Sequence, residues 1–439
     1  MAERTLPLEE ERSIGLEHFL TSSPPLGGVL KRYPSDFEVD EISEPPDLKE
    51  GGGITIARIK AVNWETNRLV RAFSKTLGIS RSHIKFAGTK DKRAITTRLF
   101  SFNIPVETVK GMDIPDVEVL EAYPSNREME LGNLKGNHFR IIVRDIKRTP
   151  LEIQDIMGLL VKDIEDNGGF PNYFGVQRFG SVRPITHLVG KNIVHGDIKE
   201  AVLSYIARPR DEEDPDIKEA RKRLEEEMDF EKALRYYPTK YLFERAMIHH
   251  LKRRPEDWAG AIDSLPDNLK MLFVHAYQSY IFNRIISKRI EKGIPLGIPI
   301  TGDRILPLNK RGLPEHYNSI PVTDDNIDRM KKLVSTGKGF VSGLIIGMES
   351  EMAQGEMGEI EREILEQENV HPEDFNITSI SNISSRGMRR ETIAPVFDLK
   401  WRVKEDNTGH LLELDFSLFR GTYATSFMRE IIKGHILDY

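Results

Sequence analysis

The spacing of apolar residues predicts β-strands near both ends of the chain. Ile54 and Ile56 alternate with Thr55 and Ala57, which is the period-two pattern of a strand. Similar patterns predict strands over 95–103 and 138–145, and two alternating runs at 399–403 and 412–418, separated by turn residues at 406–409, predict a hairpin.

Segments with helical spacing of apolar residues lie between these strands and after them. The apolar positions of 69–77 lie on one face of a predicted helix, which Asn63 is expected to cap and Gly78 to end in a left-handed conformation. A second helix is expected over 151–167, and a last one from about residue 425 to residue 433.

A long middle segment separates the two strand-rich ends. It runs from about residue 185 to 390, it is mainly helical, and it has few strand signals before residue 295. We therefore expect an α+β protein in which residues 1–184 and 391–439 fold together as one discontinuous domain. Residues 185–390 are expected to form a second, α-rich α+β domain inserted into it.

Composition narrows the class of protein. A chain of 439 residues is long enough for two domains, and no apolar run approaches the roughly 20 residues that a membrane helix needs. The N-terminal residues do not have the pattern of a secretory signal, and the chain has no cysteine, so we expect a cytoplasmic protein without disulfides. The 12 histidines show no metal-binding spacing, and we expect no metal and no cofactor.

The segment KFAGTKDKR, residues 85–93, carries the clearest candidate chemistry. It places one acid, Asp91, between Lys90, Lys92 and Arg93 in a glycine-containing turn. Neighbouring cations favour the charged form of a carboxylate, which suits a nucleophile or base that works against a polyanion. An aspartate in such a turn often only hydrogen-bonds its own backbone, so this segment alone leaves both interpretations open.

Five sequence blocks together resemble the TruD family of tRNA pseudouridine synthases. They run in order from near the N-terminus to near the C-terminus, and the second block contains the family's catalytic aspartate motif. The blocks are KRYPSDFEVDEI (31–42), FAGTKDKRA (86–94), LKGNHF (134–139), NYFGVQRFG (172–180) and FRGTYATSFMREI (419–431). The resemblance implies a catalytic domain with a mixed, mainly antiparallel sheet, interrupted by a family-specific (TRUD) domain.

The same resemblance implies roles for particular residues. Asp91 would be the catalytic aspartate, which either attacks the anomeric carbon of the ribose or removes the neighbouring sugar proton. Lys31 would pair with Asp91, and Phe174 and Phe416 would lie near the uracil. Asn172, two positions before Phe174 on an extended backbone, would share its side and could hydrogen-bond the base.

The partner implied is tRNA, with position 13 of the D arm as the target, and we expect neither a membrane nor an obligatory protein partner. Although the net charge is −6, basic residues cluster locally. The phosphate contacts that we expect are Lys85, Lys90, Lys92, Arg93, Arg178, Arg389 and Arg390.

Two other functions fit parts of the pattern. A non-catalytic tRNA-binding or tRNA-folding protein would also need a groove lined by the clustered basic residues, but it would not need the charge of Asp91. A magnesium-dependent phosphotransferase would use the turn at Gly88, although the phosphate-loop pattern is absent from the chain.

Overall fold

The computed structural model describes residues 5–90, 93–130, 133–180, 183–211, 213–406 and 409–435. The chain divides into two compact units, each made of two separate segments. We call Thr21–Phe170 with Ala394–Tyr439 the sheet unit, and Met1–Leu20 with Pro171–Ile393 the helix-rich unit. The chain passes between the units after Leu20, within β7 (Phe170–Pro171) and within β12 (Ile393–Ala394).

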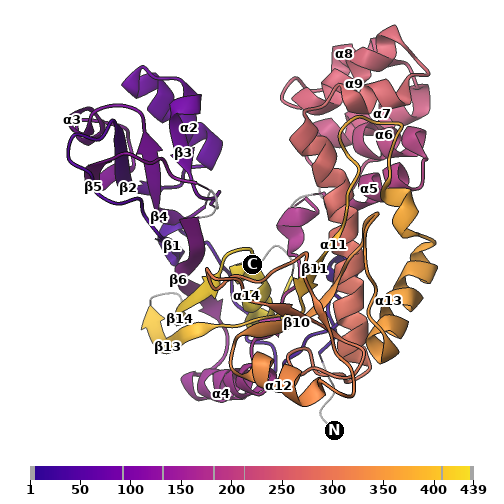
Figure 1. Ribbon diagram of the computed structural model, residues 1–439. Helices are drawn as coiled ribbons and strands as arrows, with labels where there is room; N and C mark the ends of the chain where they lie inside the picture. The colour runs from indigo at the N-terminus through magenta and orange to yellow at the C-terminus, as the bar shows by residue number, and fades with distance from the viewer. Residues whose placement is uncertain are drawn as a thin grey trace. The chain divides into compact units, whose positions relative to one another are not determined.

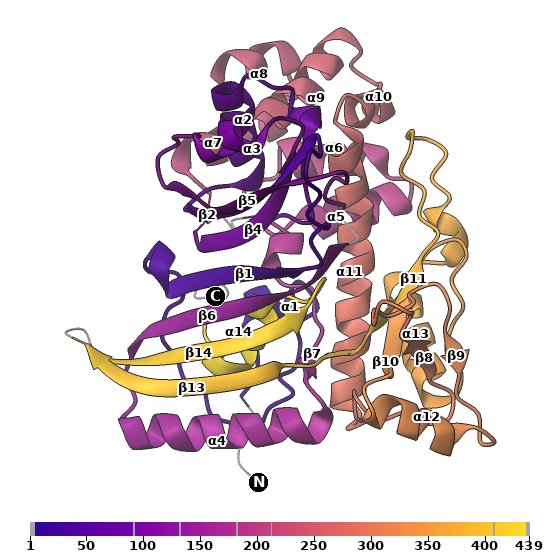
Figure 2. The ribbon, with the colours of Figure 1, turned by 60° about the vertical axis from the view of Figure 1, so that its left-hand side comes forward.

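The sheet unit is built on a mixed sheet whose strands follow the order β13-β14-β6-β1-β4-β2-β5, with β3 paired to β4. β1 and β4 run parallel, whereas the other recorded pairs in this sheet run antiparallel. Figure 2 shows β13, β14, β6 and β1 side by side. The strands are β1 (Phe37–Ser43), β2 (Ile54–Val62), β3 (Ile84–Phe86), β4 (Ile95–Phe102), β5 (Val117–Ser125), β6 (Leu134–Ile146), β13 (Phe397–Asp406) and β14 (Gly409–Phe419).

Helices pack against this sheet and form two separate hydrophobic cores with it. The helices are α2 (Thr66–Leu77), α3 (Val106–Lys110), α4 (Pro150–Asn167) and α14 (Ala424–Ile432), with short 3-10 turns η1 (Pro34–Asp36) and η2 (Arg81–His83). The apolar residues of α4 and α14 pack with those of β1, β6 and β14, and those of α2 pack with β2 and β4. The expected strands at both ends and the three expected helices, α2, α4 and α14, are confirmed.

The start of α2 differs from the expectation. Asn63 lies before the helix with φ of 59°, and the cap is Glu65, whose carboxylate accepts the N–H groups of Asn67 and Arg68. The end is as expected, because Gly78 has φ of 66°. The negative charge of a carboxylate at the cap also interacts favourably with the positive, N-terminal end of the helix dipole.

The helix-rich unit packs around one long helix, α11 (Asp267–Glu291), which Figure 1 shows beside α5 and α13. The other helices are α1 (Glu9–Arg12), α5 (Thr186–Val194), α6 (Ile198–Ile206), α7 (Pro215–Glu227), α8 (Phe230–Tyr236), α9 (Leu242–Arg253), α10 (Trp258–Asp263), α12 (Ile327–Ser335) and α13 (Gly355–Glu368), with 3-10 turns η4 (Val176–Arg178) and η5 (Pro372–Phe375). A small sheet has the order β11-β10-β8-β9 and contains β8 (Arg304–Pro307), β9 (Ile320–Pro321), β10 (Gly339–Ile345) and β11 (Met388–Glu391).

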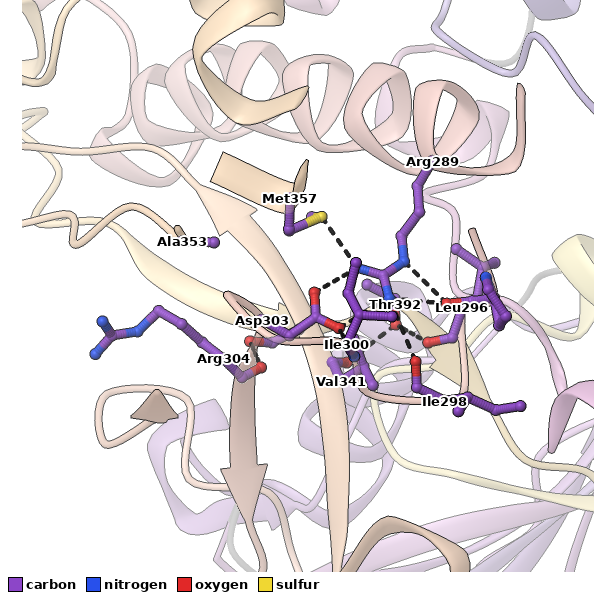
Figure 3. Close-up of polar contacts among 12 residues, drawn as sticks. Arg289, Leu296, Ile298, Ile300, Asp303, Arg304, Val341, Ala353, Met357 and Thr392 are labelled. Carbon is purple, nitrogen blue, oxygen red and sulfur yellow. Dashed lines mark hydrogen bonds and ion pairs between the residues drawn. The ribbon is translucent and has the colours of Figure 1, made fainter. Parts of the chain in front are cut away.

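A buried ion pair fastens the end of α11 to the small sheet. Arg289 and Asp303 have fully buried side chains, and their atoms Nη2 and Oδ2 lie 2.9 Å apart. Arg289 also donates to the carbonyl of Pro295. Figure 3 shows Asp303 between Arg289 and Ile300, whose N–H it accepts. Because the remaining donors and acceptors are occupied, the pair meets the condition under which buried charges are tolerated.

The units divide the chain at different residues from those expected. Residues 1–20, 171–184 and 391–393 belong to the helix-rich unit, whereas the sequence placed them with the strand-rich ends. Among the described residues, no helix is long and apolar enough to cross a membrane.

We predict that His187 makes the helix-rich unit sensitive to acid. His187 on α5 is 3% exposed, and burial lowers its pKa to about 4. Between pH 6.5 and 4 the unfolded chain binds a proton at this histidine that the folded chain does not, so stability falls as pH falls through this window. The difference in unfolding free energy between wild type and His187→Phe should change by about 3 kcal/mol between pH 7 and pH 4.

Urea denaturation at several pH values measures this difference. The other acid-sensitive groups are the same in both proteins, so their contributions cancel in the comparison. A difference that stays constant from pH 7 to pH 4 would show that His187 does not carry this pH dependence.

Candidate active site

The residue before Asp91 is held by a buried ion pair in the sheet unit. Lys90 Nζ lies 2.9 Å from Glu41 Oε2 on β1, and the two side chains are 4% and 1% exposed. Burial lowers the pKa of Lys90, and the charge of Glu41 opposes that shift. Lys90 was expected to contact phosphate, but its ammonium is occupied inside the protein, so we no longer count it among the phosphate contacts.

The main chain at Lys90 is held as well. Its N–H donates to the hydroxyl oxygen of Thr66 over 3.2 Å, and the same oxygen accepts Arg98 Nη1 over 2.9 Å. Thr66 is the first residue of α2, and Arg98 lies in the middle of β4. Asp91 and Lys92 themselves lie outside the part of the chain that the structure describes.

The other basic candidates of the sheet unit lie nearer to solvent. Lys85 on β3 and Arg93 are exposed, as a phosphate contact requires. Lys31 is half-buried, has φ of 55°, and places Nζ 4.2 Å from the centre of the Phe37 ring. Its expected pairing with Asp91 is not described, because Asp91 is not.

Phe416 belongs to the core of the sheet unit. It is fully buried, it stacks on Phe139 with ring centres 5.4 Å apart, and its ring lies edge-on to Phe427 at 4.9 Å. A ring without exposed surface cannot stack on a base, so we leave Phe416 out of the proposed site. Tyr423, in the fifth sequence block, is only half-buried and directly precedes α14.

Asn172, Phe174, Arg178 and Arg390 come together in the helix-rich unit, and we call them the Phe174 cluster. Asn172 Oδ1 accepts Arg390 Nη2 over 2.7 Å, and the Arg390 guanidinium lies 4.3 Å from the centre of the Phe174 ring. Arg178 lies 5.1 Å from the same ring. Cations over an aromatic face are attracted by its negative charge, so the ring attracts each of the two guanidinium groups.

The backbone of Phe174 is fixed by one side chain. Asn283 on α11 accepts the N–H of Phe174 over 2.9 Å and donates to its carbonyl oxygen over 3.0 Å. Phe174 is 7% exposed. A base can stack on this ring only when a guanidinium group makes room for it.

Arg389 serves a different purpose from its neighbour Arg390. It is 4% exposed, and its guanidinium donates to Ser342, to the carbonyl of Glu351 and, over 2.6 Å, to Glu361. All of these partners are inside the helix-rich unit. The expectation that Arg389 contacts phosphate is therefore abandoned, since the guanidinium has neither solvent access nor spare capacity.

Metal chemistry finds no support in the described part of the chain. No three His, Asp or Glu side chains gather there in a way that could hold an ion.

Comparison with known proteins identifies the family. The family model described as tRNA pseudouridine synthase D (TruD) matches residues 13–431. The chain belongs to the TruD family. A curated relative from Methanococcoides burtonii, named probable tRNA pseudouridine synthase D, is 43% identical over 427 residues, which are 96% of this chain and 97% of the relative. Another so named, from Thermococcus sibiricus, is 36% identical over 95% of this chain and 97% of the relative.

A solved structure supports the fold of this TruD-family chain directly. The crystal structure of the putative tRNA pseudouridine synthase D (TruD) from Methanosarcina mazei is 39% identical in sequence, with a TM-score of 0.88. The match covers 99% of this chain and 100% of the other. The expected α+β class with a mixed, mainly antiparallel sheet is confirmed.

The sequence missed two residues that the structure places next to the family's aspartate motif. Neither Thr66 nor Arg98 was a candidate. The available signal was an arginine in the middle of the apolar strand ITTRLFSF. A charged side chain in the middle of a buried strand must find a buried partner. Such buried charges are more typical of functional sites than of ordinary strands.

Replacing Arg389 by methionine should lower the unfolding free energy much more than replacing Arg390 by methionine. Arg389→Met leaves Glu361 buried without its cation, and we expect it to lower the unfolding free energy of this TruD-family protein by about 3–5 kcal/mol. Arg390→Met removes a half-buried side chain, and we expect a loss of about 1 kcal/mol. Urea denaturation of both variants tests the assignment, and equal losses would contradict it.

Proposed function

We propose that this chain converts uridine in tRNA to pseudouridine, with Asp91 as the reacting carboxylate. Membership of the TruD family carries the proposal, together with the FAGTKDKRA block that contains Asp91. The reaction breaks the bond between N1 of uracil and the ribose, turns the base, and joins its C5 to the same ribose carbon. The proton on C5 leaves and N1 gains one, so the product has the composition of the substrate.

A charged carboxylate is needed for either route to this product. Asp91 attacks the anomeric carbon of the ribose, or it removes the neighbouring sugar proton. The basic side chains of Lys90, Lys92 and Arg93 adjoin it in the sequence and favour its ionised form. Because isomerisation requires neither an oxidant nor a group donor, we propose that no cofactor takes part.

The target nucleotide must leave its helix before it can react, at a cost of a few kcal/mol. We propose that Phe174 offsets part of this cost by stacking on the extruded base, a contact worth about 1–3 kcal/mol. Asn172 is already oriented by Arg390, and Arg178 and Arg390 supply cations beside the ring for the phosphates. Movement of one guanidinium from the ring to a phosphate would open the ring for the base.

The proposed target is position 13 of the D arm, as the family resemblance implies. We propose a cytoplasmic enzyme that works without an obligatory protein partner. The competing function is a protein that binds or folds tRNA without changing it.

Asp91→Asn should separate catalysis from binding. We expect this variant to lose at least about 10²-fold in the rate of pseudouridine formation, because the amide is neither a base nor a nucleophile. Its affinity for tRNA should stay within about twofold of wild type, because the substitution removes no positively charged side chain from the protein surface that binds RNA.

Chemical mapping of pseudouridine in an unmodified tRNA transcript measures both the reaction and its position. Wild type should modify position 13, and a transcript with cytidine there should stay unmodified. Product from Asp91→Asn at the wild-type rate would overturn the role of Asp91. No product from wild type, with tRNA still bound, would favour the binding protein.

Lys85 and Arg93 should contribute to binding through phosphates. Replacing either by methionine should weaken tRNA binding and make the slope of log affinity against log salt shallower by about 1. Lys110→Met is the matched control, because Lys110 is also an exposed cation of the sheet unit but pairs with Glu107 on α3. Binding isotherms at several salt concentrations measure the slopes, and equal slopes for all three variants would contradict the proposed contacts.

A further inference from the structure

Side chains from three other segments gather around Lys90, the residue that precedes Asp91. Glu41 comes from β1, Thr66 from the start of α2, Lys90 from the loop after β3, and Arg98 from β4. The Thr66 hydroxyl oxygen joins the set by accepting both Lys90 N–H and Arg98 Nη1. We call these four residues the Thr66 cluster.

The cluster buries charges that cost stability. The side chains of Glu41 and Lys90 are 1% and 4% exposed, and Arg98 is 1% exposed as a residue. Burial is the main reason why the pKa of Arg98 falls to about 10, with the carboxylates of Glu41 and Glu65 acting in the opposite direction. A buried ion pair of this kind is seldom more stabilising than apolar residues of the same size.

Arg98 is also incompletely bonded. Its Nε and Nη2 atoms are buried, and neither finds a hydrogen-bond acceptor within the described parts of the chain. A buried donor without an acceptor costs about 1–3 kcal/mol, so stability alone does not account for an arginine at this position. Among the described residues, the one side-chain hydrogen bond of Arg98 goes to the hydroxyl that also accepts the Lys90 N–H.

We propose that Thr66 and Arg98 are positioning residues for Asp91. Thr66 fixes the main-chain N–H of Lys90, Arg98 fixes the Thr66 hydroxyl, and the pair of Lys90 with Glu41 fixes the side chain. Since Lys90 is covalently joined to Asp91, these contacts hold the chain immediately before the proposed reacting residue. This inference rests on the proposed role of Asp91.

A positioning role predicts a defect in chemistry with intact binding. Thr66→Val removes the hydroxyl and keeps the shape, and Arg98→Met removes the donor and keeps the length. Each should slow the single-turnover rate of pseudouridine formation by roughly 10- to 100-fold, because small misplacements of a reacting group have effects of this size. The dissociation constant for tRNA should stay within about twofold of wild type.

Conservative variants should restore the rate. Thr66→Ser keeps the hydroxyl, and Arg98→Lys keeps a donor and a charge, so both should react within about threefold of wild type. Phe73→Leu is the matched control for a weakened helix, because Phe73 packs α2 against Phe100 and Phe102 and does not touch the hydroxyl. It should lower the melting temperature and leave the single-turnover rate unchanged.

The outcomes separate the possible failures. Thr66→Val reacting as fast as Thr66→Ser would overturn the positioning role, and so would a Phe73→Leu variant as slow as Thr66→Val. If Thr66→Val does not fold, Arg98→Met against Arg98→Lys decides by the same comparison. Wild type and Asp91→Asn are measured alongside. No product from wild type rejects the proposed function, and an active Asp91→Asn rejects the role of Asp91. An inactive Asp91→Asn with a fast Thr66→Val rejects only the positioning.

Discussion

The antiparallel pairing of β6 with both β1 and β14 is the constraint on which the sheet unit depends. β6 is paired over most of its length on both sides, with Val39 opposite Phe139 and Phe139 opposite Phe416. It therefore joins a segment near residue 40 to one near residue 415. A side chain at Gly136 would place its Cβ 2.3 Å from the carbonyl oxygen of Leu418, so this approach of β14 requires glycine.

The same sheet explains how Lys90, the residue before Asp91, is held. β1 runs parallel to β4, and β3 and β4 are the strands on either side of residues 87–94. Glu41 on β1 is thereby brought to Lys90, and Arg98 on β4 is brought to the start of α2. The buried charges around Lys90 are thus carried by paired strands, which are stiffer than a loop.

The helix-rich unit uses buried charge in two ways. Arg289 with Asp303, and Arg389 with Glu361, are closed pairs whose hydrogen bonds hold elements together. Arg390 instead lies over the Phe174 ring and orients Asn172, and in the proposed function its guanidinium moves from the ring to a phosphate. Only the second arrangement suits a site where a ligand enters and leaves.

The sequence by itself determined the elements, the family and the identity of the candidate aspartate, because these depend on local spacing and on short blocks of residues. The tertiary structure decided which candidates are accessible. Arg389 and Arg390 are adjacent on β11, and successive residues of a strand face opposite sides, so one is buried with Glu361 and the other reaches Phe174. Phe416 is buried in the core and leaves the list of proposed site residues, whereas Thr66 and Arg98 join it. Burial and hydrogen bonding decide this, because they depend on segments that are distant in sequence and meet only in the folded chain.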